Sequence, residues 1–385
     1  MSYLRRLSTR SLVLVVVVVC ALAVGGVAIA MAAKGGGKTP QPKPLDRAIA
    51  SALAAKSPAG ITARIRFTNK LFPSGSLLGQ AGSALMSGAS GRLWLTADGR
   101  GRMELQSDAG DVQIVWNGDR ISIYDASSNT VYRATLPAGA RSHANSGNEQ
   151  PTLAEIDKVL GELGLHWTLS GATPADIAGQ PAYSVSASPK HDGGLLGSLR
   201  LAWDAVHGTP LRAAIYAHGS SSPVLEVAVT SISYGSVPSS DVDVSPPKGA
   251  RVVDLGTPSA PDHGKSAPAV TGLAKVKAKA GFPVVAPASL VGLPRRDVRL
   301  VGGDTVLVLY GHGLGGLVLV EHKAGDSGPA RALAALPTVS LDGLTAHELA
   351  TQLGTVLAWH AGGTSFVLAG SLPPAAAEAA ARAVK

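Results

Sequence analysis

The chain has a single cysteine among its 385 residues, and this residue, Cys20, lies in an apolar run near the N-terminus. No disulfide can therefore form within the rest of the chain. The ten histidines are scattered, without the H-x-H or H-E-x-x-H spacing typical of zinc sites. The G-x-S-x-G turn of the hydrolases is also missing. We therefore expect no enzymatic activity, no bound metal and no cofactor.

Charge is also scarce, since only 16% of the residues are charged and only 4% are aromatic. The formal net charge is +8, but most of this excess comes before the first acid, Asp46. Six basic residues precede it: Arg5, Arg6, Arg10, Lys34, Lys38 and Lys43. The remainder of the chain is close to neutral, so we expect no nucleic-acid partner.

One long apolar run is present, at residues 12–33, behind a basic head at residues 1–11. A bilayer-spanning helix needs about 20 apolar residues, whereas the core of a signal peptide has about 7–15. The run predicts a retained transmembrane anchor at the cell membrane, with a single-pass topology and an extracytoplasmic body. The alternative is a signal peptide cleaved near Ala30-Met31-Ala32, which leaves a secreted protein. Residues 34–44 form a Gly/Pro/Lys spacer that we expect to be mobile.

Glycine (46 residues) and proline (25) are abundant, and short alternating segments lie between them. Residues 91–136 predict an antiparallel meander, with a tight turn at Asn117-Gly118. Helical spacing marks residues 45–56 and 152–163, and the second helix opens on a capping box of Thr152 and Glu155. We expect this helix to cover the apolar face of the sheet. Further strands are predicted at residues 61–67, 167–169, 183–187, 199–203, 211–217 and 225–233.

The order of these segments resembles a known family. The stretches GRLWL (91–95), RMEL (102–105) and VQIVWNGDRISIYD (112–125) are similar to the opening sheet of LolA-type lipoprotein carriers. The later stretches 176–189, 201–219 and 223–237 resemble later strands of that superfamily, with the Gly-Thr-Pro-Leu-Arg turn at 208–212 as the most specific piece. The resemblance implies an α+β domain at residues 45–256, built as a curved antiparallel β-sheet (a half-barrel) covered by helices.

A second, smaller α+β domain is predicted at residues 275–385, after a linker at 257–274. Strand pairs are expected at 304–310 with 317–321 and at 355–359 with 365–369. A helix is expected at 374–384, whereas residues 345–353 suit either a short helix or a strand. Gly311, Gly313 and Gly316 spell G-x-G-x-x-G, but a strand follows them instead of the helix that would hold a pyrophosphate, so a hairpin loop is expected. The two-domain order is similar in architecture to MucB/RseB-type envelope-stress regulators.

Two readings of the function remain open. The apolar face of the meander could line a cavity for acyl chains, or it could simply contact the two helices. The candidate ligand-binding residues are Trp94, Met103, Leu105, Ile114, Trp116 and Ile123. With the family resemblance, this face predicts a membrane-anchored LolA-like protein that binds lipid or lipoprotein acyl chains as carrier or sensor. The alternative is a protein-binding regulator of envelope-stress (anti-sigma) signalling, which docks onto a membrane protein through residues 275–385.

Overall fold

The structure is a computed structural model that describes residues 39–71, 84–135, 151–191, 193–256, 270–323, 333–334 and 336–384. The predicted basic head, the apolar run at 12–33 and residues 257–269 of the linker lie outside the described residues. Within the described ranges, no helix has the length and apolar character needed to cross a membrane.

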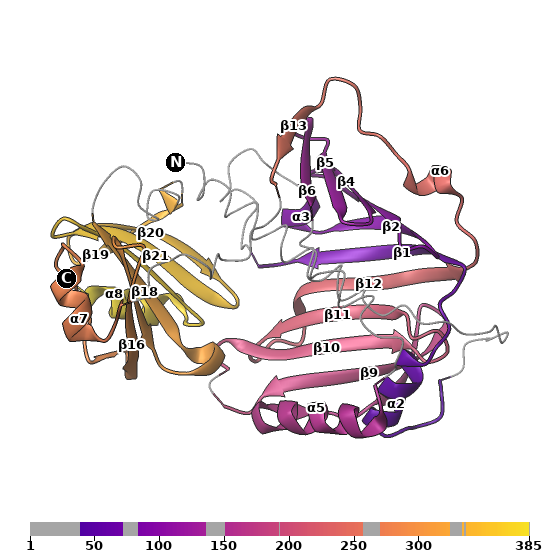
Figure 1. Cartoon of the computed structure of the whole chain (residues 1–385), viewed down its shortest axis with the longest axis horizontal. Helices are drawn as coiled ribbons and strands as arrows, with labels where there is room; N and C mark the ends of the chain where they lie inside the picture. The colour runs from indigo at the N-terminus through magenta and orange to yellow at the C-terminus, as the bar shows by residue number, and fades with distance from the viewer. Residues whose placement is uncertain are drawn as a thin grey trace.

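The first two thirds of the chain build one large sheet, which curves without closing (Figure 1). Its strands are β1 (Gly60–Asn69), β2 (Ala89–Thr96), β3 (Gly101–Ser107), β4 (Gly110–Asn117), β5 (Arg120–Asp125), β6 (Thr130–Thr135), β7 (Trp167–Leu169), β8 (Thr173–Ile177), β9 (Gln180–Pro189), β10 (Leu196–Asp204), β11 (Pro210–Ala217), β12 (Pro223–Tyr234) and β13 (Arg251–Asp254). Their order across the sheet is β13-β6-β5-β4-β3-β2-β1-β12-β11-β10-β9-β7, and β8 also pairs with β9. Neighbours are antiparallel, except that β13 runs parallel to β6. The predicted fold class is confirmed.

The alternation of apolar and polar residues explains which face of this sheet is buried. In β1, Ile61, Ala63 and Ile65 are buried, whereas Arg64 between them and Arg66 after them are exposed. This is the period of two that an extended chain imposes on its side chains. The predicted meander is present as β2 to β6, and the turn between β4 and β5 uses Gly118 at a positive φ of 60°.

Four described helices accompany the first sheet: α2 (Leu45–Leu53), α3 (Ala84–Ser87), α5 (Leu153–His166) and α6 (Ser239–Val242). The predicted capping box of α5 is confirmed, since the Thr152 hydroxyl accepts from the Glu155 backbone and the Glu155 carboxylate accepts in return. The predicted position of α5 is wrong. It lies beside α2 at the β9 end of the sheet and does not cover the meander (Figure 1). Because β7 begins directly after His166, the helix is tied to the far edge of the sheet.

The end of the spacer is fixed, although we expected it to be mobile. The Tyr183 hydroxyl, buried on β9, donates a 2.6 Å hydrogen bond to the Gln41 carbonyl. Next to it, α2 approaches the turn between β10 and β11. A side chain at Gly208, which has a φ of 65°, would come within 2.3 Å of the Ala52 carbonyl oxygen. Residues 39–44 therefore run along the surface of the first sheet in a defined course.

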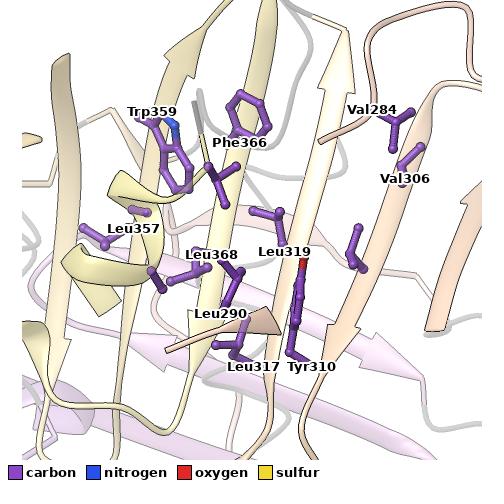
Figure 2. Close-up of a cluster of buried hydrophobic side chains, with 14 of the residues drawn as sticks. Val284, Leu290, Val306, Tyr310, Leu317, Leu319, Leu357, Trp359, Phe366 and Leu368 are labelled. Atoms are coloured by element: carbon purple, nitrogen blue, oxygen red, sulfur yellow. The ribbon is translucent and has the colours of Figure 1, made fainter. Parts of the chain in front are cut away.

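The second sheet follows, with its core shown in Figure 2. Its strands are β14 (Val270–Thr271), β15 (Ser289–Leu290), β16 (Leu293–Val301), β17 (Thr305–Tyr310), β18 (Leu317–Lys323), β19 (Thr338–Leu341), β20 (Leu344–Thr351), β21 (Gly354–Ala361) and β22 (Thr364–Gly370), with helices α7 (Leu273–Lys279) and α8 (Pro374–Arg382) and the 3-10 turn η2 (Gly313–Gly315). The predicted strand pairs and the C-terminal helix are confirmed, and residues 344–351 form a strand. Because β14 begins at Val270, residues 270–274 belong to this domain and not to the linker.

Polar contacts join the two sheets. The Leu195 amide donates a 2.9 Å hydrogen bond to the Ser371 hydroxyl, which in turn donates to the Leu353 carbonyl. A longer contact of 3.4 Å joins the Gln352 side-chain amide to the Lys70 carbonyl. The loop before β10 and the end of β22 therefore meet where the domains adjoin.

Candidate binding faces of the first sheet

Five of the six predicted ligand-binding residues share one face of the meander. Met103 on β3 lies opposite Ile114 on β4, and Ile114 lies opposite Ile123 on β5. Leu105 and Trp116 occupy the same face. Leu105 lies two residues along β3 from Met103, and Trp116 lies two residues along β4 from Ile114. The period-two alternation therefore placed these five side chains correctly relative to one another.

The protein itself covers most of this meander face. Met103, Leu105, Ile114 and Ile123 are only 2–8% exposed. They belong to one hydrophobic cluster with residues of β1 and of the short helix α3, which precedes β2. The apolar contacts of these side chains are thus largely made within the chain. The helices predicted at 45–56 and 152–163 are not the covering elements, since α3 takes that place.

Trp116 is held in position by two contacts within the meander. Its indole Nε1 donates a 3.0 Å hydrogen bond to the Gly99 carbonyl in the turn between β2 and β3. Its ring lies over Gly101, directly opposite in register, where an added Cβ would be 2.1 Å from the ring atom Cζ2. The glycine is required for this packing because any side chain would occupy the volume of the indole. Trp116 thus links two strands and a turn.

Trp94 is not on this face. Its neighbour Leu93 points toward Met103, so Trp94 points to the opposite side of the sheet, where it pairs with Thr62 and Arg102. The Arg102 guanidinium lies 5.1 Å from the centre of the indole ring, within the range of a cation–π contact. The expectation that Trp94 joins the other five side chains is therefore wrong.

The same face of the sheet continues across β12, β11, β10 and β9, and there it is open. Leu201 lies in a row between Val185 and Ala213, and it is 47% exposed. We call this surface the open apolar face, and its residues are Val185, Leu199, Leu201, Ala213, Ile215, Leu225 and Val227. None of the seven is fully buried. Sequence reasoning did not select them, although the alternation in 183–187, 199–203 and 225–233 would have placed them together.

A buried polar cluster at the turn between β10 and β11 was also missed. The Asp204 side chain is fully buried and accepts hydrogen bonds from the backbone amides of Val206 and His207. The Tyr234 hydroxyl donates to the same carboxylate at 2.6 Å, and the His207 ring stacks on Tyr234 at 3.8 Å. Burial, followed by this hydrogen bond to Asp204, raises the pKa of Tyr234. The arrangement supplies hydrogen-bond partners to a buried carboxyl group and ties the turn to β12.

The second sheet holds an acid in its apolar core. Glu321 on β18 is fully buried, and its Oε2 accepts a 2.8 Å hydrogen bond from the Val285 amide. Its Oε1 has no partner among the described residues. Burial raises the pKa of Glu321 to about 7, against the smaller opposing effects of this hydrogen bond and of Lys277. Tyr310, labelled in Figure 2, has its pKa raised to about 12 by burial.

No other arrangement with recognisable chemistry appears among these residues. In the part of the chain that the structure describes, no group of three or more His, Cys, Asp or Glu side chains is placed to hold a metal ion. Gly311, Gly313 and Gly316 form the loop between β17 and β18, and a strand follows, as predicted.

Comparison with known proteins adds a fold-level likeness. No protein-family model matches the chain, and no curated protein matches it in sequence. Its structure is similar to that of MucB in complex with MucA(peri), with 14% identity over 89% of this chain and 96% of that one, at a TM-score of 0.41. The MucA/MucB complex of Pseudomonas aeruginosa gives 13% identity, 88% and 94% coverage and a TM-score of 0.40.

A smaller similarity is found with an uncharacterized conserved protein from Thermus thermophilus. It covers 54% of this chain and 95% of that one, with 10% identity and a TM-score of 0.31.

Proposed function

We propose that this chain is a protein-binding regulator of the envelope-stress type and that it performs no chemistry. Its body lies outside the cytoplasm, attached to the membrane through residues 12–33, and its second domain contributes to a contact with a membrane protein. The observation that supports a binding role is the contrast within one sheet face. The meander half is filled by the chain's own side chains, whereas the open apolar face has Leu201 47% exposed.

The shape of the open apolar face favours a protein segment as its occupant. A site for a small apolar ligand encloses most of the surface of that ligand. Here the apolar side chains stand in rows on four neighbouring strands, with Leu199 opposite Ile215 and Leu201 opposite Ala213. A one-sided surface of this kind suits an amphipathic segment of a partner, whose apolar side is buried and whose polar side stays in water. Carriage of acyl chains is the competing function.

Leu201→Arg tests the proposal in the full chain. Leu201 is half-exposed, so the change leaves the fold intact while it places a charge on the docking surface. We expect a photoreactive amino acid at position 215 to form one discrete adduct with a protein in native membranes, and Leu201→Arg to abolish that adduct. Val252→Arg is the matched control, because Val252 is 51% exposed on β13, at the opposite edge of the first sheet.

A fluorescent fatty-acid probe supplies the decisive comparison. We expect no saturable binding of the probe to the unmutated chain. Saturable binding that Leu201→Arg removes and Val252→Arg preserves would overturn the protein-binding role and establish the lipid-carrier function. A protein adduct that persists in Leu201→Arg would also overturn the proposal, because the adduct would then form without the open apolar face.

A further inference from the structure

The side of the first sheet opposite the open apolar face carries an unusual group of cations. Arg64 and Arg66 lie on β1, and Arg92 lies on β2. All three are exposed, and in register Arg64 stands directly opposite Arg92. We call these three residues the arginine face. None of them has an ion-pair partner among the described residues.

The surroundings of the arginine face neutralise it only in part. Arg64 has Ser231 on its other side, and Arg66 lies between Ser90 and Ala228. The acids closest in register are already engaged. Glu104, which stands opposite Arg92, accepts a hydrogen bond from Arg102. Glu226, on the same side of β12, accepts from Arg212 at 2.6 Å.

The position of Arg64 directly opposite Arg92 is unfavourable for the stability of the isolated protein. Like charges directly opposite each other in a sheet destabilise it, since their Cβ atoms are only about 5 Å apart. A folded protein that keeps Arg64 opposite Arg92 gains nothing from the pair in stability. An incoming group of negative charges would relieve the repulsion and use the forked guanidinium donors.

The spacing of the cations indicates the form of that group. Arg64 and Arg66 are alternate residues of one strand, so their side chains leave the sheet about 7 Å apart. Alternate residues of any extended peptide have the same spacing. Exposed hydroxyls at Ser90 and Ser231 flank the cations on this side of the sheet. A lone phosphate would reach only part of it, whereas an extended chain would follow it along the strand.

We propose that the arginine face binds an extended acidic segment of a partner protein, with carboxylates at alternate positions. This surface is separate from the open apolar face, which lies on the other side of the same sheet. Arg64 and Arg92 are the principal contacts, and Arg66 extends the binding site along β1.

A model peptide of repeated Glu-Thr, labelled with a fluorophore, tests the assignment on the full chain in neutral detergent. We expect saturable binding that weakens as salt is added, because the contact is ionic. The double substitution Arg64→Gln with Arg92→Gln reduces affinity by about tenfold or more, as expected when charge-assisted hydrogen bonds are lost. Removal of Arg120 and Arg133, exposed on β5 and β6, is the matched control and leaves affinity within about twofold.

Three outcomes would overturn the proposal. The first is a lack of Glu-Thr binding by the unmutated chain. The second is an equal loss in the control variant, which would mean that only net charge matters. The third is displacement of the peptide by a soluble short-chain phosphatidylglycerol at equal concentration, which would assign the arginine face to lipid headgroups. Leu201→Arg leaves Glu-Thr binding unchanged, so this test and the test of the open apolar face fail independently.

Discussion

Glu321 makes the stability of the second sheet depend on pH in a direction opposite to that of most carboxylates. The pKa of this buried acid is raised from 4.5 to about 7. The folded state therefore holds its proton to a higher pH than the unfolded state does. The contribution to stability is fully present below pH 4.5 and is lost as pH rises through about 7. A difference of roughly 2.5 pKa units corresponds to about 3 kcal/mol.

Glu321→Gln isolates this contribution. Glutamine has the same shape and keeps an acceptor for the Val285 amide, but it never ionises. We expect the variant to match the unmutated chain near pH 4.5 and to exceed it in free energy of unfolding by about 3 kcal/mol at pH 8. The contributions of other titrating groups to the free energy of unfolding cancel when the two proteins are compared at each pH.

The measurement is a series of urea titrations at several pH values, read by pulsed hydrogen–deuterium labelling of β18 and β22. Asp304→Asn, whose side chain is 64% exposed on the same sheet, is the control for removal of an acid. The reasoning would be refuted by a difference between Glu321→Gln and the unmutated chain that stays constant from about pH 4.5 to pH 8. Such a result would mean that burial does not raise the pKa of this carboxyl.

Two further substitutions test the packing of the first sheet. Gly101→Ala should lower the free energy of unfolding, measured by urea titration, by about 1–3 kcal/mol, because the added Cβ would collide with the Trp116 ring. Gly235→Ala is the control. Its Cβ meets no atom within 4 Å, so the same titration should show little effect. Tyr234→Phe should lower it by about 1.5–3 kcal/mol, because the buried Asp204 side chain loses its 2.6 Å hydrogen bond. An unchanged urea midpoint for Tyr234→Phe would show that this bond is not part of the stability of the fold.

Most strands of the two sheets could be predicted because their turns and their alternation are local in the sequence, whereas β8, β13 to β16 and β19 were not predicted. The face of Trp94 could not be predicted, because it stands between Leu93 and Leu95 in a run of three apolar residues. In such a run, either the odd-numbered or the even-numbered residues could face the core. The strand register determines which, since Leu93 lies opposite the buried Ala63 of β1 and therefore faces the core.

The partners of isolated elements were harder to predict than the elements themselves. The apolar spacing of α5 predicted that this side of the helix is covered, but only Ile156 is buried, whereas Leu153, Val159 and Leu163 are 44–54% exposed. The place of α5 beside α2 was also missed. The cluster around Asp204 was missed for a similar reason. Its Tyr234 partner lies on another strand, and only the folded turn brings the two together. For the candidate site, the sequence placed the buried half of the face and left the open half unnoticed.

The position of β1 has a consequence for how the chain folds. On one side it pairs with β2, its near neighbour in sequence, and on the other with β12, so that Ile65 meets Val229. The strands β2 to β6 and β9 to β12 are each built from consecutive hairpins, which close rapidly because their loops are short. The seam between β1 and β12 is a long-range pairing, as is that between β13 and β6, and it forms only after both halves have been synthesised. An emerging chain therefore exposes two half-formed sheets, with the free edges of β1 and β12 open to wrong partners until the seam closes.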